Sequence, residues 1–194
     1  MDGRRTGDPA ASGTGGSPSD EELEVRWKEG SAPAFATLFE RYYARVHAFA
    51  FRFTRDRHLA EDIAQKTFLN LYKKPPAGTG RASFKSLAFT VTRNLAINEL
   101  KRKGRRPEAS LELSPEGPDS QPRPEERVGA AEDARRLDAV LATLPPDERE
   151  IVLLREAEGL TFREVCDVTG LSRDAVRWRL SRGMERLREG LGAS

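Results

Sequence analysis

Apolar residues recur at helical spacing through the first half of the chain. One stripe over 35–53 extends for about five turns. A second stripe predicts a helix over 58–73 that begins near Asp56 and stops before the proline pair at 75–76. A third helix is predicted over 83–103, with Ser83 as its cap. Its apolar residues fall on two opposite faces, so it is either buried on both sides or keeps one face for a partner.

The last third of the chain also predicts helices only. A short amphipathic helix over 137–144 ends at a second proline pair, after which Asp147 is expected to cap the next helix. Thr161 is expected to cap a further helix, with Glu164 at the capping-box position. The pattern therefore predicts an all-α protein of two small helical domains joined by a flexible acidic linker.

Composition and turn residues place the boundaries of these domains. Residues 1–20 are rich in Gly, Ser and Pro and are expected to form a disordered tail. The first helical domain spans 21–106 and the second spans 131–191. The segment between them, 107–130, is rich in proline and acidic residues, as expected of a flexible linker.

The stretch TFREVCDVTGLSRDAVRWRLSRGMERL has the pattern of a helix-turn-helix, with Gly170 in the turn and Ser172 capping the second helix. In this motif the second helix enters the major groove by its N-terminal residues. The candidate DNA contacts on its outer side are Arg173, Arg177, Trp178, Ser181 and Arg182. Two alternatives stay open: a solvated arginine-rich face, and burial of Trp178 against a neighbouring segment.

Charge is distributed unevenly. Residues 35–106 carry a net charge of +11, whereas 107–134 carry −6. The basic block suits a polyanion, and its five cations within 101–106 would attract phosphates. The alternative is a solvated helix end that favours its own dipole. The acidic segment over 108–126 is a candidate cover for the basic block when no partner is bound.

Few residues suit catalysis or metal binding. Cys166 is the only cysteine, so no internal disulfide is possible, and the two histidines lack zinc-ligand spacing. No catalytic residues, metal or cofactor are predicted, and Cys166 is interpreted as a small core residue. No stretch approaches the roughly 20 apolar residues of a membrane span, so we expect no membrane insertion and a reducing cytoplasm as the location.

The outer face of the 58–73 helix carries Asp62, Gln65 and Leu69. A protruding leucine beside a carboxylate and an amide is typical of a protein-binding surface, although an ordinary solvated face is the alternative.

Two long segments resemble the sigma-70 family of bacterial RNA polymerase sigma factors. The stretch FATLFERYYARVHAFAFRFTRDRHLAEDIAQKTFLNLYKK, followed by SFKSLAFTVTRNLAINELKRKGRR, resembles region 2. The stretch LDAVLATLPPDEREIVLLREAEGLTFREVCDVTGLSRDAVRWRLSRGMERLREGL resembles region 4. Without segments resembling regions 1.1 and 3, the chain is similar to the extracytoplasmic-function group.

This resemblance implies core RNA polymerase and promoter DNA as partners, and leaves an anti-sigma factor open as a third. Asp62, Gln65 and Leu69 would meet the clamp helices of one large polymerase subunit, while region 4 would rest on the flap of the other. The −35 element would be read by the helix-turn-helix. The −10 element would be captured and melted by Arg81, Lys85, Arg93, Asn94, Lys101 and Arg102.

The chain departs from the family pattern at four positions. Ser86 replaces a usual tryptophan, Asn98 an aspartate, Trp178 a small residue and Gly183 an alanine. These departures keep one alternative open, a sigma-like adaptor without promoter melting. A polymerase-independent helix-turn-helix regulator is the main rival, and a small nucleic-acid hydrolase is a weaker one, because no catalytic set is found.

Overall fold

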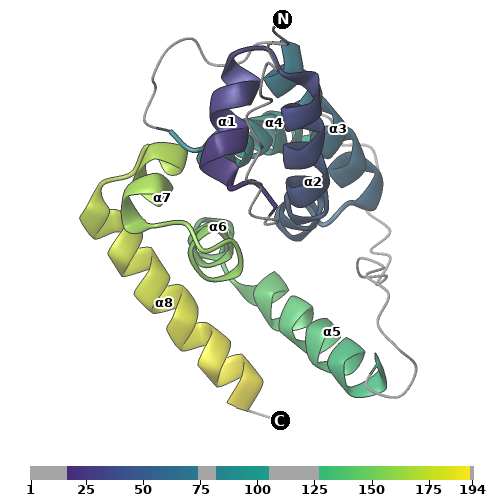
Figure 1. Cartoon of the computed structure of the whole chain (residues 1–194). Helices are drawn as coiled ribbons and strands as arrows, with labels where there is room; N and C mark the ends of the chain where they lie inside the picture. The colour runs from purple at the N-terminus through teal and green to yellow at the C-terminus, as the bar shows by residue number, and fades with distance from the viewer. Residues whose placement is uncertain (1–16, 74–81, 105–126, 193–194) are drawn as a thin grey trace, which may run out of the picture.

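The computed structural model describes residues 17–73, 82–104 and 127–192, and all the regular elements within these ranges are helical. We call α1–α4 the first unit and α5–α8 the second unit (Figure 1). The elements are α1 Asp20–Lys28, α2 Ala32–Thr54, α3 Arg57–Lys73, α4 Phe84–Gly104, α5 Arg127–Thr143, α6 Pro146–Val152, the π-helical turn η1 Leu153–Ala157, α7 Phe162–Thr169 and α8 Arg173–Gly192.

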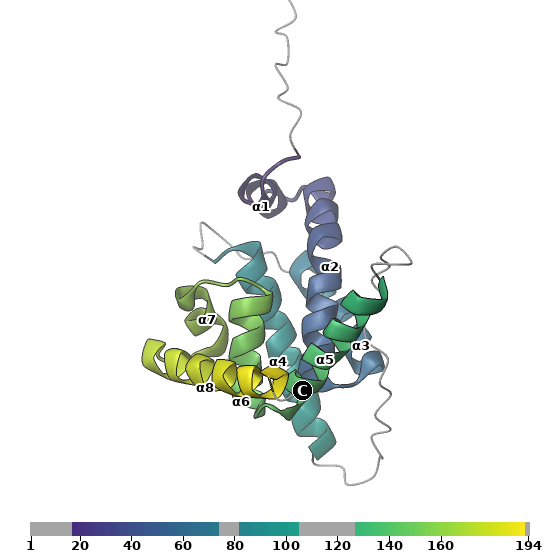
Figure 2. The ribbon, with the colours of Figure 1, turned by 90° about the horizontal axis from the view of Figure 1, so that it is seen from below.

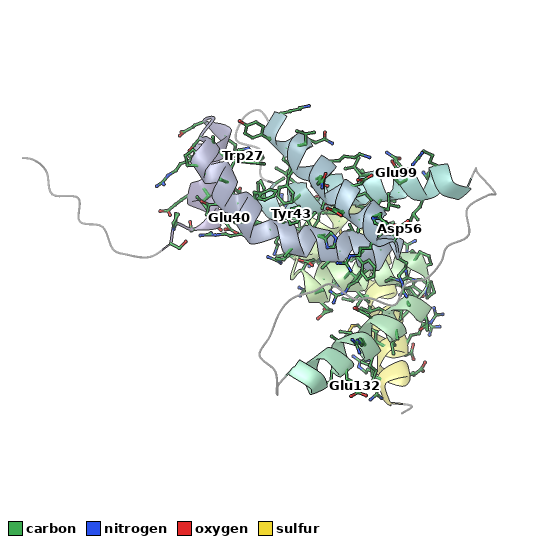
Figure 3. All side chains as sticks on the ribbon, turned by 90° about the vertical axis from the view of Figure 1, so that its right-hand side faces the viewer. Trp27, Glu40, Tyr43, Asp56, Glu99 and Glu132 are labelled. Atoms are coloured by element: carbon green, nitrogen blue, oxygen red, sulfur yellow. The ribbon has the colours of Figure 1, made fainter. Side chains whose placement is uncertain are left out.

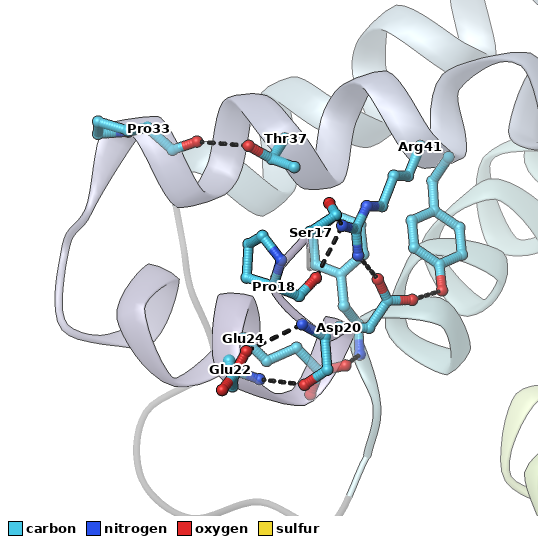
Figure 4. Close-up of polar contacts among 11 residues, drawn as sticks. Ser17, Pro18, Asp20, Glu22, Glu24, Pro33, Thr37 and Arg41 are labelled. Carbon is cyan, nitrogen blue, oxygen red and sulfur yellow. Dashed lines mark hydrogen bonds and ion pairs between the residues drawn. The ribbon is translucent and has the colours of Figure 1, made fainter. Parts of the chain in front are cut away.

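Helix α1 begins at Asp20, the last residue of the segment expected to be a disordered tail. Ser19 and Glu22 form a reciprocal capping box at its start. Asp20 then binds Arg41 of α2 at 2.6 Å and accepts a hydrogen bond from the Tyr42 hydroxyl (Figure 4). Burial acts to raise the pKa of Asp20, but these two donors hold it below its usual value.

An aromatic core joins the four helices of the first unit. Trp27 of α1 meets Phe84 of α4 edge-on, with ring centroids 5.1 Å apart. Phe35 of α2 lies between Trp27 and Phe68 of α3. Figure 3 shows Trp27 near one end of α2 and Asp56 at the other. The side chain of Asp56 accepts a hydrogen bond from a backbone N–H in the first turn of α3, as expected of a cap.

Helix α4 is buried on two sides, which settles the question that its two apolar faces raised. It packs on α2 and α3 on one side and on α7 on the other (Figure 2). Ala88 and Phe89 are both fully buried. Ser83 caps the helix by accepting from the Ser86 N–H, as predicted. One of the two apolar faces of α4 is therefore the face that packs on α7 of the second unit.

In the second unit the predicted helix-turn-helix is present. Thr161 and Glu164 form the capping box, and Gly170 takes the left-handed φ of 71° that ends α7. Ser172 caps α8 through the Ala175 N–H. The cap predicted at Asp147 is wrong: Pro145 is the N-cap and no side chain caps this helix. Because Pro146 begins the helix, the Asp147 carboxylate lies in its first turn, where it interacts favourably with the helix dipole.

Helix α5 begins at Arg127, inside the segment predicted as linker. Helices α6 and α8 pack closely at Gly183, where an added Cβ would lie 2.7 Å from Cγ2 of Val152. The branched Cβ of Val152 restricts its χ1 rotation, so the side chain can move little to make room for an added methyl group. This contact gives a physical reason for glycine at the position where the family has alanine.

We therefore expect Gly183→Ala to destabilise the fold by about 1 kcal/mol, although alanine favours helix by a similar amount. In a Val152→Ala background the same change should become stabilising. Gly192→Ala is the matched control, because its Cβ would meet open space. Thermal unfolding of the four members of the cycle and the control gives the coupling; equal effects in both backgrounds would contradict the close contact.

Candidate functional site

The outer face of α3 is exposed, as its stripe predicted. Asp62, Gln65 and Leu69 all point to solvent, and Leu69 is 49% exposed. Tyr72 follows one turn later and is also exposed, its ring tilted against Phe35 of α2 at 5.2 Å. Sequence reasoning missed Tyr72, although its i+3 spacing from Leu69 places the two side by side. The face therefore combines an apolar edge with a carboxylate and an amide.

The residues predicted to bind the −10 element divide into two sets. Asn94, Lys101 and Arg102 are exposed on α4, and Arg102 pairs with Glu99, one turn before it in the same helix. Lys85 and Arg93 instead face the second unit. Arg81 lies outside the described residues, as does the acidic segment over 108–126.

Two buried glutamates of the second unit, Glu150 and Glu158, contact cations of the first unit. Arg93 forms an ion pair with Glu150 of α6. Arg45 of α2 binds the Glu158 carboxylate through Nε at 2.9 Å and the Glu158 carbonyl through Nη2, also at 2.9 Å. Lys85 donates to the same carbonyl at 3.2 Å. We call this set of contacts the clasp.

The carbonyls in the clasp are available because a helix ends there. The turn η1 closes at Glu158, and Gly159 follows with a left-handed φ of 64°. The last carbonyls of a helix lack internal partners and carry its partial negative charge. Lys85 therefore also donates to the Gly159 carbonyl, at 3.1 Å. Arg45 and Lys85 of the first unit thus donate hydrogen bonds to backbone carbonyls at the end of η1.

Burial makes both carboxylates dependent on their arginines. The Glu150 and Glu158 side chains are 7% and 6% exposed. Burial raises the pKa of Glu150, and Arg93 offsets part of that rise. Burial likewise raises the pKa of Glu158, which Arg45 partly offsets. A charge so placed needs its partner, since an unpaired buried carboxylate is costly.

Further contacts extend the clasp along both units. Arg52 of α2 binds Asp138 of α5 at 2.8 Å. Ser83, at the start of α4, donates to Glu164 of α7 at 2.9 Å. The first helix of the helix-turn-helix thus contacts the first unit through α4, while the recognition helix α8 contacts other elements of its own unit.

The outer side of α8 is open, and all five predicted DNA contacts lie on it. Arg173, Arg177, Trp178, Ser181 and Arg182 are exposed. Trp178 is 61% exposed, which rules out its burial against a neighbouring segment in this arrangement. The Arg177 guanidinium lies over the Phe162 ring, 5.8 Å from its centroid, and Arg182 binds Glu185 at 2.8 Å.

Other candidate chemistry is sparse within the described ranges. Cys166 is half-buried and packs against the core, as interpreted from its place in the motif. No group of three or more His, Cys, Asp or Glu side chains in the described residues could hold a metal ion. Among those same residues, none of the helices has the length and apolarity needed to cross a membrane.

Comparison with known proteins agrees with this geometry. Residues 38–106 match the family model of sigma-70 region 2, and residues 134–187 match that of sigma-70 region 4. The RNA polymerase sigma factor CarQ of Myxococcus xanthus is 34% identical over 173 residues, covering 86% of this chain and 94% of CarQ. The sigma factor SigE of Mycolicibacterium smegmatis is 30% identical over 178 residues, covering 89% of this chain and 69% of SigE.

Two solved structures share the fold. The sigma factor RpoE from Bartonella quintana, solved with the anti-sigma factor NepR, aligns with a TM-score of 0.69 at 22% identity, over 81% of this chain and 96% of that one. CnrH, solved with the cytosolic domain of CnrY, aligns with a TM-score of 0.65 at 21% identity, over 90% and 98% of the two chains.

The match to region 2 does not favour a polymerase-independent regulator, which would need the helix-turn-helix alone. Both units, their order and the length of the matched relatives agree. The chain belongs to the sigma-70 family of RNA polymerase sigma factors, in its extracytoplasmic-function group.

Proposed function

We propose that this sigma factor binds core RNA polymerase through the outer face of α3 and directs it to promoters through α4 and α8. The observation that carries the proposal is the gathering of Asp62, Gln65 and Leu69 on one exposed face of the first unit. An exposed leucine flanked by polar groups is suited to the centre of a protein interface. The polymerase subunit recognised there is the one that presents the clamp helices.

The DNA roles divide between the two units. Asn94, Lys101 and Arg102 lie on the open part of α4 and would hold the −10 element, together with Lys85 and Arg93 once the clasp opens. A basic surface suits a melted strand because it follows the phosphates. The five outer residues of α8 would bind the −35 element, with α8 in the major groove.

The protein acts as a binding subunit of the polymerase, without catalysis or cofactor of its own, and works in the cytoplasm. Two structural neighbours were solved with NepR, an anti-sigma factor, and with the cytosolic domain of CnrY. By analogy in fold, an inhibitory protein of this kind is a further proposed partner of this chain.

The clasp withholds part of the proposed −10 surface from DNA in the free chain. Lys85 and Arg93 cannot contact phosphates while they contact Glu150 and the end of η1. Because promoter binding needs these cations, the two units must separate when polymerase is bound. In the described residues, three acidic groups of the second unit meet cations of the basic block: Glu150, Glu158 and Asp138.

The α3 interface is tested by charge reversal. Asp62→Lys should weaken binding of core polymerase at least tenfold, since central interface residues contribute about 2 kcal/mol or more. Glu132→Lys makes the same charge change on an exposed part of α5 and should bind as the wild type does. Binding is measured by anisotropy of the labelled chain titrated with core enzyme. Equal affinity of the two variants would place the interface elsewhere.

The clasp is tested by Glu150→Lys, which places a lysine ammonium group beside the Arg93 guanidinium and so replaces attraction by repulsion. We expect a larger radius of gyration in small-angle X-ray scattering, and tighter binding of the free chain to nonspecific DNA at low salt, because Lys85 and Arg93 are released. Glu189→Lys adds the same charge to an exposed site on α8 and serves as the control. An unchanged radius, with affinity equal to that of the control, would show that the clasp does not restrain the chain.

A further inference from the structure

Trp178 is an exposed indole on the outer side of α8. Its exposed fraction is 61%, whereas the other tryptophan, Trp27, is 3% exposed in the aromatic core. Among the described residues, none makes a ring-stacking or cation–π contact with Trp178. Aromatic side chains contribute most when they are covered, so a bare indole on a stable helix indicates a surface completed by a partner.

The position of Trp178 points it away from its own unit. Val176 and Leu187, on the inner side of α8, are buried. At 100° per residue, Trp178 lies about 160° from Val176 around the helix axis. It also falls in the second turn of α8, in the N-terminal part that a recognition helix inserts into the major groove. The indole is therefore directed toward base edges if this helix binds DNA.

The cations beside Trp178 are held along the protein surface. Arg177 lies over the Phe162 ring, Arg179 binds Asp147 at 3.0 Å, and Arg182 binds Glu185 at 2.8 Å. These contacts keep the guanidinium groups to the flanks, where phosphates run on either side of a groove. The indole is the apolar group that remains between them.

An apolar side chain in the major groove finds one apolar feature among the four bases, the C5-methyl group of thymine. The indole N–H adds little selectivity, because guanine, adenine and thymine all present acceptors there. We propose that Trp178 is a specificity-determining residue that contacts the C5-methyl of a thymine in the upstream promoter element. This inference rests on the proposed reading of the −35 element by α8.

The test uses holoenzyme assembled from core polymerase and the full chain. Duplexes with a randomised upstream element are selected with the wild type, Trp178→Ala and Trp178→Phe. The wild type should enrich thymine at one position, Trp178→Ala should accept all four bases there, and Trp178→Phe should keep a weaker thymine preference. Because the side chain is exposed, both variants should unfold at the wild-type temperature.

The methyl group itself is then removed by placing deoxyuridine at the selected thymine. Wild-type affinity should fall about fourfold, the equivalent of one buried methylene, and that of Trp178→Ala should not change. Deoxyuridine at the other thymines of the duplex is the control. An equal response of wild type and Trp178→Ala to deoxyuridine would overturn the role of Trp178. If the wild-type holoenzyme enriched no upstream sequence at all, the proposed function of α8 would fail first, and this inference with it.

Discussion

The arrangement of the two units depends on buried glutamates of region 4 that are neutralised by cations of region 2. Glu150 and Glu158 would be costly to bury alone. Arg93 and Arg45 supply the opposite charge, and Lys85 satisfies the carbonyls at the end of η1. The net free energy of such pairs is small, because separation returns both partners to water. The clasp therefore fixes how the two units face each other, and the apolar contact between α4 and α7 accompanies it.

The clasp affects the two proposed DNA-binding surfaces differently. It engages Lys85 and Arg93 of region 2, whereas the outer side of α8 in region 4 stays open. The contact between α7 and α4 explains this difference, because the first helix of the helix-turn-helix faces inward and its recognition helix does not. The free chain thus exposes one DNA surface and part of the other. The proposed polymerase-binding face of α3 lies outside the clasp.

Local features of the fold could be predicted from the sequence. The helices, the cap at Ser83, the capping box at Thr161 and the turn at Gly170 follow from short-range backbone chemistry. Helical spacing also placed Asp62 and its neighbours on an exposed face of α3. The cap expected at Asp147 was wrong because the preceding prolines already fix the helix start. The domain boundaries stay a prediction.

Long-range pairing could not be predicted. Arg93 and Glu150 are 57 residues apart, and Arg45 and Glu158 are 113 apart. No periodicity links such positions, so no sequence pattern indicated that Arg93, a cation predicted to bind DNA, would face an acid of the other unit. A helical wheel likewise gives the side on which Trp178 lies but not what covers it. The short helix α1 was missed because Asp20 depends on Arg41 and Tyr42, more than 20 residues along the chain.

The most direct test of the account is the distance between the two units with and without core polymerase. Spin labels at Glu40→Cys in α2 and Glu189→Cys in α8, in a Cys166→Ser background, report it by pulsed electron resonance; both sites are exposed. We expect one distance in the free chain and a longer one when core enzyme is added. A distance that stays the same in the polymerase complex would contradict it, because Lys85 and Arg93 would then never reach the promoter.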